Sequence, residues 1–510
     1  MGASEHAQRG LRILAAGRRH LDRPALADAQ GSWTYAELLD RSALAAHRLV
    51  RTPGWERGCR VGMFLPRRKE SAAVLLAVLR AGGIAVPFSV RAAARELAHE
   101  IADAGVTRIV ADAGFGELLA DVRGSGLTEL PHVVDPGWLC ADADDRWDEP
   151  EPGDDEPALM VYTSGTTGLP KGVVHTHGSL FAQVDVLAHA WEWTAADRLL
   201  HVLPLHHVHG LVNGLLGAIR AGAQLEFLDR FDPSDVWNRF AERRASVFYA
   251  VPTIYHQLVE AWDAADPATR RRWAEGAAAL RLTVSGSAAL PTSLWNRWHA
   301  ISGQALLERY GMTEIGMALS NPYRAERRAG TVGQPLPGVH IRLVTETGED
   351  AGEGVPGEIW IQSPTLFREY WNKPAATEAS FRDGYFLTGD VAEWDHGYLR
   401  IRGRASVDIL KSGGYKLSAL EIEEALREHP AIREVAVVGV PDEEWGEIVA
   451  ACVVLHPDQC LTLEMLRNWC RDKLASYKLP RRLDVRTELP RNAMGKVMKP
   501  DLVRNLKVNA

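Results

Sequence analysis

Hydrophobic and polar positions follow two alternating patterns in the first 120 residues of the chain. Short apolar runs bounded by charged residues or glycine predict strands at residues 60–64 and 107–111, and helical patterns lie between such runs. The arginine-bearing segment 9–19 is interpreted as an amphipathic helix that leads into a first strand at 23–27. Further strands are expected at residues 158–161, 281–284 and 357–361. This alternation is typical of an α/β fold.

The pattern changes after Arg404, where a smaller α+β unit begins. A capping box, Ser418-Ala419-Leu420-Glu421, predicts a helix that runs to about residue 429. Strands are expected at 434–440 and 448–455, and another helix at 462–474. We therefore expect an N-terminal domain over residues 1–403, α/β with twisted sheets, and a small C-terminal α+β domain over residues 404–510.

Composition narrows the functional class. The 510 residues carry 58 Lys and Arg against 66 Asp and Glu, a formal charge of −8, which argues against a nucleic-acid binder. The longest apolar stretch, residues 72–88, is interrupted by Arg80 and two glycines, so no membrane insertion is expected. Five scattered cysteines form no metal-ligand spacing and predict reduced thiols in a cytoplasmic protein.

Residues 163–172 read Thr-Ser-Gly-Thr-Thr-Gly-Leu-Pro-Lys-Gly and follow the predicted strand 158–161. Glycines let a backbone approach a phosphate closely, hydroxyls add donors, and Lys171 adds positive charge. Taken alone, the segment could equally be an ordinary hairpin loop. It also lacks the usual phosphate-loop spacing, because glycine rather than Ser or Thr follows Lys171. A nucleotide held here would require a different fold.

The sequence of this segment resembles the phosphate loop of the adenylate-forming superfamily, which includes acyl-CoA synthetases, adenylation domains and luciferases. Other short motifs follow in the family's order: Gly-Ser-Ala at 286–288, Tyr-Gly-Met-Thr-Glu at 310–314, and Leu-Thr-Gly-Asp at 387–390. The resemblance implies ATP as substrate and Mg²⁺ as cofactor. The ATP-binding residues it implies are Thr163, Ser164, Gly165, Thr166, Thr167, Gly168, Lys171, Gly286, Ser287, Ala288, Glu308, Tyr310, Gly311, Met312, Thr313, Asp390 and Arg404.

The resemblance also assigns individual roles. Tyr310 would stack on adenine, and Asp390 would accept both ribose hydroxyls, which suits an acceptor-only group. Thr166 and Glu314 would hold Mg²⁺. Each of these residues, standing alone, would more often be a surface charge or a turn residue.

A third motif lies near the C-terminus, where Pro490-Arg491 precedes Gly495-Lys496. By resemblance, Lys496 is catalytic with Thr166, Glu314 and His207, because an ammonium offsets the repulsion between a carboxylate and a phosphate. The family's small domain is mobile and rotates between half-reactions. Ser412, Gly413, Gly414 and Tyr415 would then line the CoA tunnel. The chain departs from its relatives at the hinge, where Ser406 replaces Asp or Lys and Asp408 lies beyond it.

Arg309 narrows the acid, because most relatives have a small residue at this position beside the acyl pocket. A guanidinium would pair with a second carboxylate on the substrate, although a structural salt bridge to Glu308 or Glu314 is the alternative. The motifs around Arg309 and around residues 203–210 resemble those of malonyl-CoA synthetases. Within 203–210, His207 would gate the pocket, and no cysteine or carboxylate nearby favours zinc.

One position departs from those relatives. They tend to carry a second basic residue where this chain has His256 and Gln257. His209 or His256 could supply the missing donor, or the pocket could accept methylmalonate or another small acid. The expected reaction is ligation of malonate or a close dicarboxylate to CoA through an acyl-adenylate. The alternatives are a short- or medium-chain monocarboxylate acyl-CoA synthetase, or an adenylation enzyme that loads a carrier protein in trans.

Overall fold

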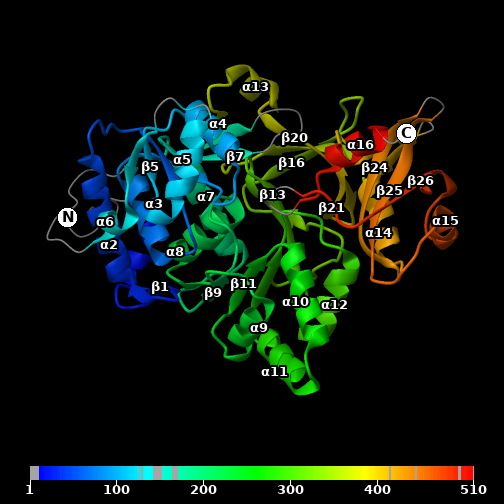
Figure 1. Ribbon diagram of the computed structural model, residues 1–510, viewed down its shortest axis with the longest axis horizontal. Helices are drawn as coiled ribbons and strands as arrows, with labels where there is room; N and C mark the ends of the chain where they lie inside the picture. The colour runs from blue at the N-terminus through cyan, green and yellow to red at the C-terminus, as the bar shows by residue number, and fades with distance from the viewer. Residues whose placement is uncertain are drawn as a thin grey trace.

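The protein is described by a computed structural model, which covers residues 11–125, 127, 130–141, 152–163, 170–412, 415–442, 445–491 and 496–508. Two large sheets with parallel centres, flanked by helices, make up most of the N-terminal part (Figure 1). The predicted mixed α/β class is confirmed, with a large N-terminal part and a smaller C-terminal one. Every segment expected to be a strand contains one.

The first sheet has seven strands and is parallel from β7 to β6, with an antiparallel edge formed by β8 and β18. In order across the sheet these are β18 (Glu369–Tyr370), β8 (Lys171–Thr176), β7 (Pro157–Thr163), β4 (Ile84–Phe88), β3 (Arg60–Phe64), β5 (Arg108–Val110) and β6 (His132–Val134). β7 and β8 form the hairpin whose connection is the glycine-rich segment of the sequence.

The second sheet has nine strands and is parallel from β13 to β1. Its order is β15 (Gln334–Pro335), β14 (Gly316–Ser320), β13 (Leu307–Met312), β12 (Leu282–Ser285), β11 (Val247–Ala250), β9 (Arg198–His201), β10 (Gln224–Phe227), β1 (Pro24–Asp28) and β2 (Gly31–Thr34). Parallel strands carry continuous apolar runs because both faces are covered, and β11 and β12 are buried at every position.

Helices cover these two sheets (Figure 1). They are α2 (Tyr35–Val50), α3 (Lys69–Arg80), α4 (Ala94–Ala104), α5 (Gly116–Gly124), α6 (Pro136–Cys140), α7 (His177–Ala190), α8 (Gly217–Ala221), α9 (Pro233–Ala241), α10 (Pro252–Ala264), α11 (Pro267–Ala278), α12 (Thr292–Ser302) and α13 (Pro374–Ala379). Within the described ranges, no helix is both long and apolar enough to cross a membrane.

The helix expected at residues 9–19 is wrong over its described part. Two short 3-10 turns, Arg12–Leu14 and Gly17–Arg19, take its place. Gly17 lies against the ring of Tyr35, where an added Cβ would approach Cδ1 to 2.5 Å. This tertiary contact, together with the low helix propensity of glycine, overrides the local amphipathic pattern.

A third, antiparallel sheet leads toward the C-terminal domain. It consists of β16 (His340–Val344), β17 (Gly357–Gln362), β20 (Tyr385–Asp395), β19 (Phe381–Arg382) and β21 (Tyr398–Arg404). β20 and β21 pair so that Asp390 lies opposite Arg404.

The C-terminal sheet combines β23 (Tyr415–Ser418), β22 (Ile409–Ser412), β25 (Gly446–Leu455), β24 (Ile432–Asp442) and β26 (Arg482–Arg486). Its helices are α14 (Ala419–Arg427), α15 (Leu463–Cys470) and α16 (Lys499–Val508), and the whole unit lies at one end of the molecule (Figure 1). The predicted capping box is half formed: Ser418 accepts from the nitrogen of Glu421, but the Glu421 carboxylate pairs with Lys478 and Arg402 instead. α14 also ends two residues earlier than expected.

Candidate active site

A cavity of about 2740 Å³ is lined by residues from both the N-terminal and the C-terminal parts of the chain. β11, β12 and β13 are parallel neighbours, so the segments that follow them meet at one edge of the sheet. These segments bring Val251, Ser287 and Thr313 to the cavity wall, and Lys496 comes from the C-terminal side. Residues from predicted motifs that are far apart in the sequence therefore share one space.

Three predicted nucleotide residues are joined by direct hydrogen bonds. The Tyr310 hydroxyl donates to Oδ2 of Asp390 at 2.6 Å, and Nε of Arg404 donates to Oδ1 at 2.8 Å. Arg404 also donates to the carbonyl oxygen of Thr388 at 2.8 Å, which fixes the plane of its guanidinium. Each carboxylate oxygen keeps a second lone pair, so Asp390 can still accept hydroxyl donors from a ligand.

Glu314 is a buried carboxylate in the turn between β13 and β14. The hydroxyl of Tyr370 donates to its Oε1 at 3.0 Å, and burial raises the pKa of Glu314 above its ordinary value. His175 contacts the neighbouring carbonyl oxygen of Thr313 at 2.7 Å through Nε2 and holds the turn in place. A carboxylate kept away from water in this way is a suitable ligand for a hard cation.

Lys496 lines the same cavity from the C-terminal side. Burial among protein groups lowers its pKa, although the Lys496 side chain itself faces open space in the cavity. Asp390 and Glu314 oppose that shift, whereas Arg404 and Arg309 reinforce it. The lysine is therefore within electrostatic range of both the predicted nucleotide residues and Arg309.

Arg309 extends from β13 into the wall of the cavity and is only 4% exposed. Burial lowers the pKa of Arg309 to about 10, so the guanidinium stays charged near neutral pH. Among the described residues it forms no salt bridge, and its Nη2 donates a hydrogen bond to Oγ of Ser287 at 3.3 Å. The alternative of a structural salt bridge to Glu308 or Glu314 is therefore wrong. Instead, the Glu308 carboxylate accepts from the backbone nitrogen of Leu290 at 3.2 Å.

Gly286 explains how such a large side chain fits. A Cβ added at Gly286 would lie 2.7 Å from Cζ of Arg309, so only glycine leaves room for the guanidinium. The next residue, Ser287, has a backbone φ of 69°, which is unusual for a residue other than glycine. The predicted adenine wall at 286–288 thus also shapes the surroundings of Arg309.

The histidines of residues 206–209 form one side of the cavity. The ring centroids of His206 and His207 lie 4.1 Å apart. Burial lowers the pKa of His207 to about 3. His209 is buried, and its ring stacks on Tyr249 with centroids 6.2 Å apart. His209 begins a π-helical turn, His209–Leu216, of a kind often found at functional sites.

Two segments of the chain match models of one enzyme family. Residues 14–371 match the AMP-binding enzyme family, and residues 421–496 match the AMP-binding enzyme C-terminal domain. The chain belongs to this family.

Relatives of the AMP-binding enzyme family cover most of the sequence. A malonate–CoA ligase of Arabidopsis thaliana is 43% identical, with 88% of this chain and 78% of the relative aligned. The mitochondrial malonate–CoA ligase of Homo sapiens is 42% identical over 95% of this chain and 90% of the relative. ATP-bound MatB from Rhodopseudomonas palustris has a TM-score of 0.88 at 33% identity, covering 98% of this chain and 99% of that one.

Membership of the AMP-binding enzyme family implies Mg²⁺ as a cofactor, and the Glu314 carboxylate is a suitable ligand for this ion. Mg²⁺ in nucleotide sites is commonly held by one or two carboxylates together with phosphate oxygens. In the described ranges no cluster of three or more His, Cys, Asp or Glu side chains could bind a metal without such a ligand. Bound there, Mg²⁺ would neutralise phosphate charge. Its second predicted ligand, Thr166, lies outside the described residues, as do Ser164, Gly165, Thr167 and Gly168.

Two predicted CoA-binding residues lie away from the cavity. Ser412 is buried, whereas Tyr415 is exposed and stacks on Tyr477 with ring centroids 4.3 Å apart. Neither lines the cavity that Lys496 lines. Gly413 and Gly414, between them, fall outside the described residues.

One residue and one contact at this site were missed by the sequence reasoning. Tyr370 lies in β18, which pairs with β8 although the two strands are far apart in the sequence. No local pattern therefore links its hydroxyl to Glu314. The hydroxyl of Ser287 also contacts His209, with Oγ 3.2 Å from Nδ1. That contact depends on the packing of two segments 78 residues apart, and no sequence signal announces it.

Proposed function

We propose that the protein ligates malonate, or a close small dicarboxylate such as methylmalonate, to CoA at the expense of ATP. The substrate carboxylate attacks the α-phosphorus of ATP, which forms the acyl-adenylate and expels pyrophosphate. The CoA thiol then attacks the acyl carbon, which forms the thioester and releases AMP. In this proposal Asp390, Arg404 and Tyr310 hold the nucleoside, and Lys496 stabilises charge on the reacting carboxylate and phosphate.

The observation that carries this proposal is the buried charge of Arg309. A guanidinium with 4% exposure and no carboxylate partner in the described chain is costly unless a ligand supplies the partner. A carboxylate at the far end of the substrate would pair with it, whereas a monocarboxylate would leave it unpaired. The names of the plant and human relatives and the structure of a malonyl-CoA ligase with methylmalonyl-CoA and AMP support the same choice.

The missing second basic residue is best replaced by His209. His256 is half-exposed and lies 3.6 Å from Glu260 on its own helix, and Gln257 is exposed at the cavity edge. His209 is buried within electrostatic range of Arg309. We therefore place the distal carboxylate between Arg309 and His209.

The acceptor in this proposal is CoA rather than a carrier protein, since the relatives described above are CoA ligases by name. The cytoplasmic location stays a prediction. All five cysteines are free thiols, as in a reducing compartment, while the human relative is named as mitochondrial.

The decisive experiment is AMP release measured across a panel of acids, with CoA and with a carrier protein as acceptors. Malonate or methylmalonate should give a higher kcat/KM than acetate, propionate or hexanoate. Arg309→Ala should lower kcat/KM for malonate by about 100-fold or more, because the carboxylate loses its charged partner. Propionate should change by less than about threefold.

Arg309→Lys serves as the matched control. It keeps the charge but loses the planar fork, so we expect an intermediate loss for malonate. A preference for dicarboxylates that survives Arg309→Ala would contradict the proposal. Acceptance of a carrier protein but not of CoA would contradict the choice of acceptor.

A further inference from the structure

Three polar side chains from three separate segments meet at the acyl end of the cavity. Nη2 of Arg309 lies 3.3 Å from Oγ of Ser287, and that oxygen lies 3.2 Å from Nδ1 of His209. All three residues line the cavity. Among the described residues, Nε2 of His209 and Nε of Arg309 are buried without a hydrogen-bond partner.

The direction of each hydrogen bond follows from which atoms carry protons. A guanidinium only donates, so Ser287 must accept from Arg309. The single hydroxyl proton of Ser287 is then directed to Nδ1 of His209, which accepts it. The opposite arrangement, with the proton on Nδ1, would leave the serine hydroxyl without an acceptor in the described part of the chain.

His209 carries only one ring proton under physiological conditions. Burial, and next the charge of Arg309, hold the pKa of His209 well below its ordinary value of 6.5, so the ring is neutral. With Nδ1 acting as acceptor, that proton lies on Nε2. The buried nitrogen that lacks a protein partner is therefore a donor.

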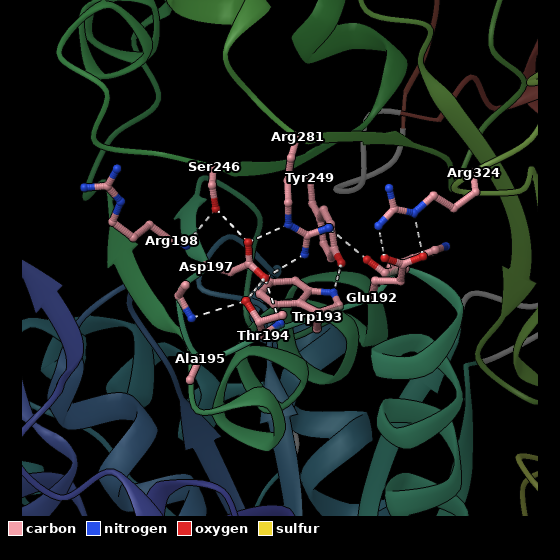
Figure 2. Close-up of polar contacts among 12 residues, drawn as sticks. Glu192, Trp193, Thr194, Ala195, Asp197, Arg198, Ser246, Tyr249, Arg281 and Arg324 are labelled. Atoms are coloured by element: carbon pink, nitrogen blue, oxygen red, sulfur yellow. Dashed lines mark hydrogen bonds and ion pairs between the residues drawn. The ribbon is translucent and has the colours of Figure 1, made fainter.

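Packing also restrains the plane of the His209 ring. It stacks on Tyr249 at an interplanar angle of 28°. Tyr249 is itself fixed, because Nε1 of Trp193 donates to its hydroxyl at 2.8 Å. Figure 2 shows this pair beside the Asp197–Arg281 ion pair, in which Nε of Arg281 lies 2.5 Å from Oδ1 of Asp197.

We propose that Ser287 is a positioning residue that fixes His209 as the Nε2–H tautomer, so that His209 and Arg309 together donate to the distal carboxylate of the substrate. This inference rests on the proposed function and deepens it. A neutral histidine adds a hydrogen bond without adding a second positive charge, so one carboxylate neutralises the site. The arrangement replaces the second basic residue that the sequence lacks near Gln257.

The strained backbone of Ser287 supports a role for its side chain and also offers a clean variant. A φ of 69° is favourable for glycine and unfavourable for serine. Ser287→Gly therefore removes the hydroxyl while relieving strain, and it should fold at least as well as the wild type. Ser293 also lines the cavity, and its hydroxyl forms no hydrogen bond within the described part of the chain, so Ser293→Ala is the matched control.

The first test compares malonate with propionate in Ser287→Gly, Ser287→Ala and Ser293→Ala. The hydrogen bonds from Arg309 to Ser287 and from Ser287 to His209 form a relay. Loss of this relay should raise KM for malonate by about tenfold or more in both Ser287 variants, with kcat within about threefold. In the Ser287 variants, propionate kinetics should change much less than the KM for malonate, and Ser293→Ala should behave as the wild type. Equal losses for malonate and propionate in the Ser287 variants would overturn the relay.

The second test reads the tautomer directly. A long-range ¹H–¹⁵N spectrum of the ¹⁵N-histidine protein, assigned with His209→Gln, should place the proton on Nε2 in the wild type. In Ser287→Gly that fixed tautomer should be lost. In kinetics, His209→Gln, whose amide nitrogen reaches the position of Nε2, should keep more malonate preference than His209→Asn.

The outcomes separate the two claims. A wild type that does not prefer malonate to propionate would overturn the proposed function. If the wild type prefers malonate but carries the His209 ring proton on Nδ1, the relay alone would be overturned. The same would follow if His209→Asn kept more of the malonate preference than His209→Gln.

Discussion

The Glu424 side chain of α14 accepts a hydrogen bond of 2.7 Å from the backbone nitrogen of Thr292, the first residue of α12. The residue before it, Pro291, provides no side-chain cap for this helix. A carboxylate is favourable at a helix N-terminus, where free N–H groups and the helix dipole meet. Helix α14 thus supplies the cap that α12 lacks, and this contact crosses the predicted domain boundary at residue 403.

We expect Glu424→Gln to weaken the arrangement in which Lys496 faces the cavity. A hydrogen bond from a charged group contributes about 1.5–3 kcal/mol, so the adenylation half-reaction should slow by about tenfold. Exchange of labelled pyrophosphate into ATP measures this step alone. Thioester formation from a supplied acyl-adenylate should change by less than about twofold.

Glu428→Gln is the matched control for that prediction. Glu428 follows α14 directly and pairs with Lys473 of its own domain. It should leave pyrophosphate exchange unchanged. Equal slowing of both half-reactions by Glu424→Gln would show that Glu424 stabilises the fold rather than one arrangement of the domains.

Glu308 should make the protein less stable as the pH rises. Burial raises the pKa of Glu308 from 4.5 to about 8, whereas the unfolded chain keeps the ordinary value. Between these values the unfolded state releases a proton that the folded state retains, which favours unfolding by about 1.4 kcal/mol per pH unit. The stability held below pH 4.5 is therefore lost as the pH rises toward 8.

The check is urea unfolding of the wild type and Glu308→Gln at several pH values. Gln can still accept from Leu290 but cannot ionise. The stability of Glu308→Gln relative to the wild type should therefore increase steadily between pH 5 and pH 8. A difference that does not vary with pH would mean that Glu308 is already ionised in the folded protein.

The order of short motifs along the chain carried most of what the sequence could predict about the site. Asp390 and Arg404 each sit in a recognisable segment, and both line the cavity. Their mutual ion pair could not be predicted, because it depends on the register of β20 and β21. Individual site residues could be predicted from local sequence motifs, whereas the contacts between them depend on strand pairing.

Contacts distant in sequence also explain the errors. The Glu421 carboxylate was expected to complete a capping box but pairs with Lys478 and Arg402, which come from other elements. The contact of Ser287 with His209 likewise joins the end of a strand to a π-helical turn. Local propensity could suggest a helix start or a loop, but it could not choose between partners that only the folded chain brings close.

Lys499 should be important for stability. Its ammonium is nearly buried and lies 2.5 Å from Oδ1 of Asp408 and 2.7 Å from Oε1 of Glu423. Lys499→Met would leave two carboxylates without this partner, and breaking a buried pair in this way costs about 3–5 kcal/mol. Thermal unfolding should show a clear loss of stability, while Lys507→Met, at an exposed position of the same helix, should show none. An unchanged Tm in Lys499→Met would contradict the prediction.

Lys496 should set the alkaline limit of adenylation. Burial lowers the pKa of Lys496 below the ordinary 10.5, and a lysine loses its charge as the pH rises through its pKa. If the ammonium stabilises the reacting anions, pyrophosphate exchange will decline at a lower pH than an ordinary lysine would cause. Lys496→Arg should be slower because the planar guanidinium fits the site less well, but its decline should move to higher pH, since arginine keeps its charge. Thioester formation from supplied acyl-adenylate, measured over the same pH range, should not show this shift between wild type and variant. An identical alkaline limb in both proteins would assign the limb to another group.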